Sequence, residues 1–290
     1  MTPEIDGRPV RRLARQVEAI HTVAYYSPEI GRLTDDGYRG WWHAYFAYRA
    51  APMGPVPASV VTATFYNFAP RMVERAVPGV WGILTPAEIL ARRNELVAEA
   101  LGRIWADGRL DAELAEAAEL SARAVAAIEI EARPLAAAHA ELPWPDGSPA
   151  LRLWHACTIW REYRGDGHNL ALAAAGVDGL ESHLLMAAHG HGNQATITGI
   201  RGWTDEEWAA AGERLTSRGI LVADGTYTDA GRRFRSDVEG ATDERSAGPL
   251  DRLEPDEVAR LQDLLGVITA DLLECGAVPG VWPPPNVRRS

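Results

Sequence analysis

The sequence predicts a mainly α protein, in which a multi-helical body is followed by a small two-stranded β wing of winged-helix type near the C-terminus. Three observations predict this fold class. Apolar residues recur at three- and four-residue spacing along most of the 290 residues, and long stretches are rich in alanine. Strand-like residues occur as a short pair, Ile220–Leu221–Val222 and Thr226–Tyr227–Thr228, on either side of an Asp-Gly turn.

The composition restricts the class of protein. The chain is 47% hydrophobic and 24% charged. It has no apolar run near the roughly 20 residues that cross a bilayer, and its first residues lack the apolar core of a signal peptide. We therefore expect a cytoplasmic protein with no membrane partner. Every basic residue is arginine, which excludes Schiff-base chemistry on lysine. The two cysteines, Cys157 and Cys275, are expected to be reduced thiols.

The first part of the chain predicts three helices. Residues 7–27 form the first, and we assign the arginines along one of its faces to solvent or to ion pairs. Those arginines are Arg8, Arg11, Arg12 and Arg15. The second helix, residues 40–51, is dense in aromatic side chains, and the third begins near Ala58 and is either ended or kinked by Pro70. Aromatic rings at helical spacing indicate core, with a ligand cavity as the alternative.

Longer helices follow. Two alanine-rich helices are predicted at residues 86–105, where Thr85 is the cap, and at residues 111–140. A central helix starts at Leu151. We expect it to break at residues 164–167, where two glycines allow a turn, and to restart at His168 with Asp166 as the cap.

A winged-helix pattern follows residue 192. A helix over residues 204–218 leads into the hairpin and then into Ala230–Gly231–Arg232. A last helix, residues 255–275, has a one-sided apolar stripe that would pack on the body or on a second copy. We divide the chain into a helical ligand-binding body (1–192), a winged-helix segment (193–246), a packing or dimerisation helix (247–276) and a flexible tail (277–290).

The charge of the winged-helix segment is opposite to that of a typical DNA-binding surface. Residues 201–245 contain seven arginines and ten acidic residues, a balance of -3, and the whole chain has a net charge of -11. Surfaces that bind DNA are normally basic. We therefore expect this segment not to read DNA. In the alternative, the arginines after the wing would contact phosphates, and these are Arg232, Arg233 and Arg235.

A His-Gly-His-Gly turn raises the question of a metal. His189 and His191 are one residue apart, and His183 lies six residues before His189. Two imidazoles at this spacing can converge on an ion, but no nearby cysteine or carboxylate completes the ligand set. We expect a surface loop and no metal site.

Polar side chains at positions that look buried define the candidate site. Buried polar groups need partners, so a concentration of them indicates a binding site. Histidine can carry a proton near neutral pH, and arginine can bind a carboxylate or phosphate. The candidate proton-transfer groups are His155, Asp166 and His168. The candidate ligand-binding residues are His21, Tyr25, Tyr26, Arg49, Tyr66, Asn67, Arg71, Trp154, Arg161 and Arg164. With no phosphate loop, nucleophile elbow or zinc motif, the sequence indicates neither a reaction nor a cofactor.

Four stretches carry a resemblance to a known family. They are YYSPE (25–29), FAYRAAPMGPVPASVVTATFYNFAP (46–70), WHACTIWREYRGDGHNLALAAAGVDGLE (154–181) and RGWTDEEWAAAGERLTSRGILVADGTYTDAGR (201–232). Together they resemble an actinobacterial family of helical proteins with a MarR-like winged-helix segment at the C-terminus. The resemblance implies the architecture and no activity. Asn169 and HGHGN (189–193) depart from the family's pattern.

Three hypotheses about function follow. The first is a small-molecule-binding protein of actinobacterial specialised metabolism, which transforms or sequesters a polar or anionic, aromatic ligand. The second is a ligand-responsive winged-helix regulator, in which the same site biases a homodimer on DNA. The third is an interaction scaffold, which is favoured if side chains fill the cavity.

Overall fold

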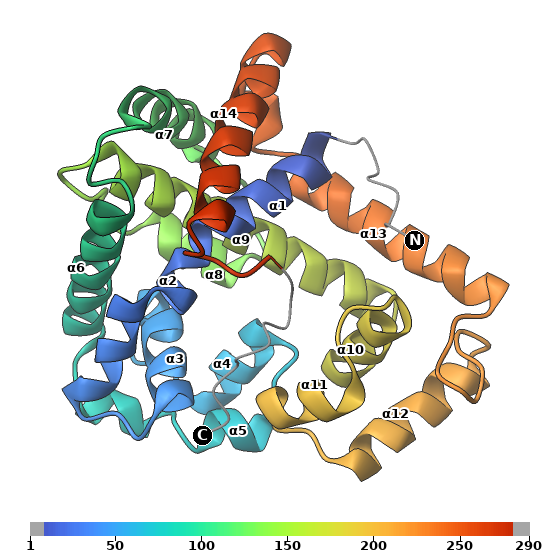
Figure 1. The fold of residues 1–290 in the computed structure, drawn as a ribbon. Coiled ribbons are helices and arrows are strands. Elements are labelled where there is room, and N and C mark those ends of the chain that lie inside the picture. The colour runs from blue at the N-terminus through green and yellow to red at the C-terminus, as the bar shows by residue number, and fades with distance from the viewer. Residues whose placement is uncertain (1–8, 281–290) are drawn as a thin grey trace.

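The computed structural model describes residues 9–280, and within that range the chain is helical (Figure 1). Short 3₁₀ helices are labelled η. The N-terminal part contains α1 (Pro9–His21), α2 (Val23–Tyr26), η1 (Pro28–Asp36), α3 (Trp41–Ala50), η2 (Ala51–Met53), α4 (Ala58–Phe65), α5 (Pro70–Glu74) and η3 (Gly79–Gly82). The middle contains α6 (Pro86–Ile104), α7 (Asp111–Val125), α8 (Pro134–Ala140) and α9 (Pro149–Ala174). The rest contains α10 (Gly179–Ala188), α11 (Gln194–Arg201), α12 (Asp205–Ser217), α13 (Asp229–Ser246), η4 (Leu250–Arg252) and α14 (Pro255–Glu274).

Helix α9 lies at the centre of the fold and contacts α1, α6, α7, α8 and α13 (Figure 1). It begins where the Ser148 hydroxyl accepts a hydrogen bond from the Leu151 amide at 3.3 Å, with Pro149 in the first turn. Between Leu153 and Trp160 every side chain is buried, because other helices cover all of its sides. This position explains why no single apolar face is visible in its sequence.

The predicted break at residues 164–167 is wrong, because α9 continues through both glycines to Ala174. A Cβ on Gly167 would lie 2.8 Å from Arg133 Nη1 and 3.3 Å from the Arg245 carbonyl oxygen. This glycine therefore allows α13 and the residue preceding α8 to approach α9 closely. Asp166 does not cap a restarted helix. Its carboxylate caps α8 by accepting hydrogen bonds from the Leu135 and Ala136 amides at 3.0 and 2.9 Å.

The predicted two-stranded β wing is also wrong. The segment after α12 forms a tight turn with a single antiparallel bridge between Leu221 and Tyr227, and the part of the chain that the structure describes contains no strand. The Val222 amide donates to the Thr226 carbonyl at 2.9 Å, and the Thr228 amide donates to the Ile220 carbonyl at 3.1 Å. A pair of three-residue segments with no third partner is too short to form a sheet. The mainly α part of the predicted fold class is confirmed.

Two other expected helices are interrupted. The helix predicted over residues 111–140 is divided into α7 and α8, with Ala132 at a φ of +57° and Pro134 at the start of α8. The first predicted helix ends at His21 and resumes as α2, while Arg8 at its start lies outside the described residues. The capping box expected at Thr85 is present in α6.

The apolar side chains form two clusters. The larger one joins α1, α3, α4, α6, α7, the N-terminal half of α9, and α14, which packs on α1 and α7. The smaller one joins the end of α9 with α10, α12 and α13 through residues such as Leu172, Leu184, Leu215 and Val238.

The domain boundaries expected from the sequence stay a prediction. Residues 281–290 of the predicted tail lie outside the described residues.

Within residues 9–280 no single helix is both long and apolar enough to cross a membrane. In that range only α9 and α10 taken together meet both criteria, and the pair is bent by 97°.

Candidate functional site

The structure brings part of the predicted site together around Glu162, a residue of α9 that is 1% exposed. Its carboxylate accepts hydrogen bonds from Arg161 Nη1 at 2.9 Å and from Arg49 Nη2 at 3.3 Å. Burial by itself would raise the pKa of Glu162, but the charges of Arg161 and Arg49 together hold it well below its usual range. We call the surrounding group the central polar cluster, which consists of His21, Tyr25, Tyr45, Arg49, Thr158, Arg161 and Glu162.

His21 forms one end of the central polar cluster. The Thr158 hydroxyl donates to the Trp154 carbonyl at 2.8 Å, so it accepts from His21 Nδ1 at 3.0 Å. His21 Nε2 is then free to accept from the Tyr25 hydroxyl at 2.8 Å. Burial and the nearby charge of Arg161 lower the pKa of His21 well below its usual value, so the ring is neutral. Trp154 donates its indole N–H to the His21 carbonyl at 3.2 Å and so lies against the cluster.

Arg49 and Arg161 give the cluster an excess of positive charge. The Arg49 guanidinium lies 4.2 Å from the centre of the Phe65 ring and donates to the Tyr45 hydroxyl at 3.1 Å. Arg161 also donates to Glu18 at 3.0 Å, and these two side chains are 22% and 48% exposed, so the cluster reaches the surface there. Within residues 9–280, two fully buried atoms of the cluster have no hydrogen-bond partner, namely Arg49 Nε and Glu162 Oε1.

The remaining predicted ligand-binding residues lie elsewhere. Arg71 on α5 forms a two-pronged ion pair with Glu207 on α12, at 2.8 and 2.5 Å. Tyr66, which ends α4 at a φ of +63°, donates its hydroxyl to the Val177 carbonyl at 2.5 Å. The Asn67 carbonyl accepts from His183 Nε2 at 3.1 Å. These contacts fasten α10, α12 and the bend that precedes α10 to the body. Tyr26 is half-buried, and burial raises its pKa to about 12.

The predicted proton-transfer residues are not brought together. His168 faces α13, where its Nδ1 lies 2.9 Å from the Thr242 hydroxyl, and Arg164 beside it lies 3.8 Å from Glu239. His155 stands thirteen residues earlier, about 20 Å along the same helix, with its ring 4.9 Å from Trp144. Burial lowers the pKa of both His155 and His168 to about 4. Burial also raises the pKa of Asp166 to about 6.

Sequence analysis missed two charged or titratable residues near the cluster. Arg93 on α6 and His139 on α8 are 3% and 2% exposed. Both helices were treated as scaffold because they are rich in alanine. Arg93 occupies a core position between Ile89 and Leu96. An arginine within such an apolar stripe is the signal in the sequence that could have identified it.

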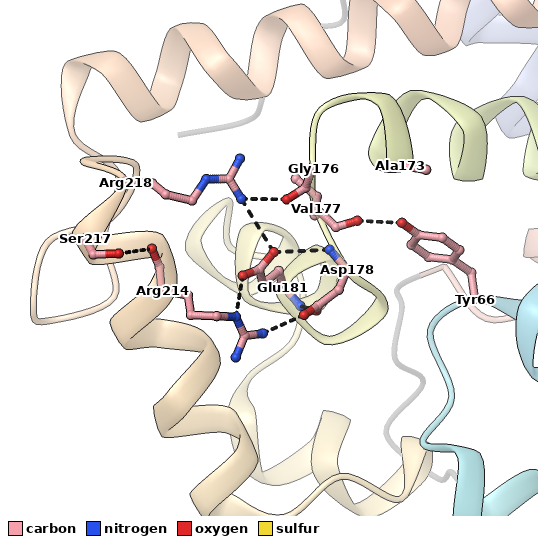
Figure 2. Close-up of a pocket in the computed structure, with 9 residues that line it drawn as sticks. All are labelled: Tyr66, Ala173, Gly176, Val177, Asp178, Glu181, Arg214, Ser217 and Arg218. Carbon is pink, nitrogen blue, oxygen red and sulfur yellow. Dashed lines mark hydrogen bonds and ion pairs between the residues drawn. The ribbon is translucent and has the colours of Figure 1, made fainter.

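The helix-turn-helix segment consists of α10, α11 and α12, which pack on one another, followed by the turn and α13 (Figure 1). Figure 2 shows how α12 is attached at the bend between α9 and α10. Arg214 donates to Glu181 at 2.9 Å and to Asp178 at 2.5 Å, while Arg218 donates to the carbonyls of Gly176 and Ala175 at 2.7 and 2.9 Å. These groups line an open surface cavity of about 720 Å³.

The outward side of α12 is acidic. Asp205, Glu206 and Glu213 are exposed, whereas the guanidinium groups of Arg214 and Arg218 bind groups of α9 and α10. Of the arginines after the turn, Arg232 pairs with Asp229 and Arg235 pairs with Glu239.

The His-Gly-His-Gly turn brings two imidazoles close to each other. The rings of His189 and His191 stack with their centres 5.3 Å apart, and the His183 ring binds the Asn67 carbonyl. In the range 9–280 no three histidine, cysteine or acidic side chains are grouped so that they could hold a metal ion.

Comparison with known proteins gives one match. The sequence profile of a helix-turn-helix family matches residues 10–279, which is nearly the whole chain. Neither the curated proteins nor the solved structures give a match. The family is consistent with a DNA partner, and it gives no support to the expectation that the segment does not read DNA. Because the match includes the body as well as the segment α10–α12, the chain as a whole belongs to this helix-turn-helix family.

Proposed function

We propose that this protein is a ligand-responsive regulatory protein, whose helical body binds a small anionic, ring-containing molecule at the central polar cluster. The observation that carries the proposal is the pair of buried, unpartnered atoms, Arg49 Nε and Glu162 Oε1. Leaving such atoms without a partner costs about 1–3 kcal/mol each, and more for charged groups. A bound polar molecule would supply the missing hydrogen bonds.

The chemistry of the cluster indicates the class of ligand. Two guanidinium groups face one buried carboxylate, so a carboxylate or phosphate on the ligand would balance the charge. The rings of Tyr25 and Tyr45, with centres 5.7 Å apart, offer an aromatic wall beside Arg49. The ligand would enter at the exposed edge, where it would compete with Glu18 for Arg161.

Helix α9 offers a connection between the ligand site and the helix-turn-helix segment. Arg161 and Glu162 lie in its middle, and Arg218, which caps the end of α12, binds the carbonyls of Ala175 and Gly176 directly after α9. A displacement of α9 caused by a ligand would therefore reach α12 directly. In this proposal the protein acts in the cytoplasm. In the same proposal the ligand is a molecule of actinobacterial specialised metabolism.

The ligand site can be tested by titration with benzoate, 4-hydroxybenzoate and inorganic phosphate, using calorimetry and thermal unfolding. We expect at least one of these anions to bind the wild type. The Arg161→Gln variant should bind it at least tenfold more weakly, because a charge-assisted hydrogen bond contributes about 1.5–3 kcal/mol. Arg123→Gln, which removes an exposed ion pair between α7 and α14, is the matched control and should bind like the wild type. Equal binding by Arg161→Gln would contradict the proposal.

DNA binding is a second candidate function, with which the match to a helix-turn-helix family is consistent. Arg232 and Arg233, at the start of α13, are exposed next to the turn that would follow a recognition helix. A gel-shift assay on the DNA upstream of the coding sequence should show a complex at low salt. The double change Arg232→Ala and Arg233→Ala should weaken it and reduce its salt dependence. The Arg123→Ala variant should bind normally, and the absence of a complex at low salt would exclude this candidate.

A further inference from the structure

Arg93 is a buried cation with few partners. Its side chain lies in the core stripe of α6, and its guanidinium carbon is 5.2 Å from the centre of the Trp154 ring. The hydrogen bond from Arg93 Nη2 to Asn94 Oδ1 is long, at 3.4 Å. The Nε atom has no partner among residues 9–280, and no carboxylate in that range forms an ion pair with Arg93.

Three other buried or partly buried arginines have carboxylate or carbonyl partners. Arg49 and Arg161 bind Glu162, and Arg133 donates to the carbonyls of Tyr163 and Arg245 at 2.8 and 2.6 Å. An uncompensated buried charge costs several kcal/mol, because the protein interior replaces the lost hydration only in part. Burial accordingly lowers the pKa of Arg93 to about 10. Arg93 therefore sits where a negative charge would be strongly stabilising.

His155 directly follows Trp154, whose ring lies against the Arg93 guanidinium, and it supplies a second donor. It is 1% exposed, and its Nε2 atom has no partner among the described residues. The pKa of His155 is lowered to about 4, mainly by burial and secondly by the charge of Arg93. The same two causes lower the pKa of His139 to about 3. A neutral imidazole can present an N–H from Nε2.

The side chain of Trp144 covers His155 from the outside. Its ring centre lies 4.9 Å from that of His155, and the Arg152 guanidinium lies 5.5 Å from the centre of the same indole. Trp144 is only partly buried and belongs to the loop between α8 and α9, which contains two prolines and a glycine.

We propose that Arg93 and His155 form a binding site for a small carboxylate anion, which enters beside Trp144. One guanidinium and one neutral imidazole balance a single negative charge, and the two oxygens of a carboxylate match two separate donors. The site uses none of the residues on which the proposed function depends.

Formate is the probe for this site, measured by calorimetry and by thermal unfolding against sodium chloride at the same ionic strength. We expect formate to raise the Tm of the wild type in a saturable manner and beyond the effect of chloride. In Arg93→Met this response should be lost, and without formate this variant should be no less stable than the wild type, because it removes an uncompensated charge. Arg123→Met is the matched control and should respond like the wild type.

His155→Phe keeps a ring against Trp144 but removes the donor, and it should bind formate at least tenfold more weakly. If Arg93→Met does not fold, this variant carries the test. An equal response to formate in the variants and the wild type would overturn the proposal, and so would an equal response of the wild type to chloride. Arg161→Gln should keep the formate response, which separates this site from the central polar cluster.

Discussion

At the residue scale, the polar interior depends on the balance of charge around Glu162. One carboxylate holds two guanidinium groups that come from different helices, α3 and α9. Removing one partner of a buried ion pair is costly because the remaining charges lose their compensation. Glu162 therefore contributes to the fold as well as to the candidate site.

We predict that Glu162→Gln lowers the free energy of unfolding by about 3–5 kcal/mol, because Arg49 and Arg161 would then lack a buried counter-charge. Urea denaturation provides the measurement. Glu18→Gln also removes an acceptor of Arg161, but Glu18 is 48% exposed and the change should cost less than about 1 kcal/mol. Similar losses in the two variants would show that burial does not determine the contribution of Glu162.

At the element scale, α9 stays helical through a sequence that locally favours a turn. Gly165 and Gly167 lie in the same helix but have different surroundings. A Cβ on Gly165 would lie 3.6 Å from Glu162 Oε2, an ordinary contact, whereas a Cβ on Gly167 would lie 2.8 Å from Arg133 Nη1. The continuous helix therefore requires glycine at only one of the two positions.

This difference gives a matched pair of variants. Gly167→Ala should destabilise the protein by about 1–3 kcal/mol, because the added methyl group overpacks the contact with Arg133 and Arg245. Gly165→Ala should leave stability unchanged or raise it by up to about 1 kcal/mol, since alanine favours a helix over glycine. Thermal or urea unfolding measures both. Equal destabilisation by both variants would instead indicate a turn at residues 164–167.

Helix α12 uses its two arginines for contacts within the protein, although both side chains reach the surface. Arg214 and Arg218 bind the bend between α9 and α10 (Figure 2). Asp205, Glu206 and Glu213 of the same helix are exposed. These two arginines therefore join α12 to the end of the helix that passes through the candidate ligand site.

At the scale of the whole molecule, burial keeps several histidines neutral. The pKa values of His139 and His183 are lowered to about 3, and those of His155 and His168 to about 4. In the unfolded chain a histidine titrates near pH 6.5. Because the folded values are lower, the stability these residues contribute is complete above about pH 6.5 and is lost as the pH falls toward 4.

We therefore predict that the free energy of unfolding decreases between pH 6 and pH 5, by up to about 1.4 kcal/mol per pH unit for each such histidine. Urea denaturation at several pH values measures this slope. His155→Phe should reduce the slope by about that amount because it removes one of the groups. His191→Gln, which changes an exposed side chain, should keep the wild-type slope. A slope unaffected by His155→Phe would contradict this account.

The sequence by itself determined the features that depend on neighbours along the chain. The capping boxes that begin at Thr85 and Thr204 lie within four residues, so their spacing fixed the starts of α6 and α12. Arg49, Arg161 and His21 were identified because each is a polar residue in an apolar helical pattern. The mainly α class follows from the same local periodicity.

Only the tertiary structure decided the features that depend on distant contacts. Gly167 lies in a helix because Arg133 and Arg245 approach it, and Asp166 caps α8, which lies about thirty residues earlier in the chain. The segment after α12 pairs only through a single bridge, and Tyr66, Asn67 and Arg71 bind the helix-turn-helix segment instead of the central polar cluster. Spacing along the chain specifies local hydrogen bonds, whereas these outcomes depend on which helices pack together.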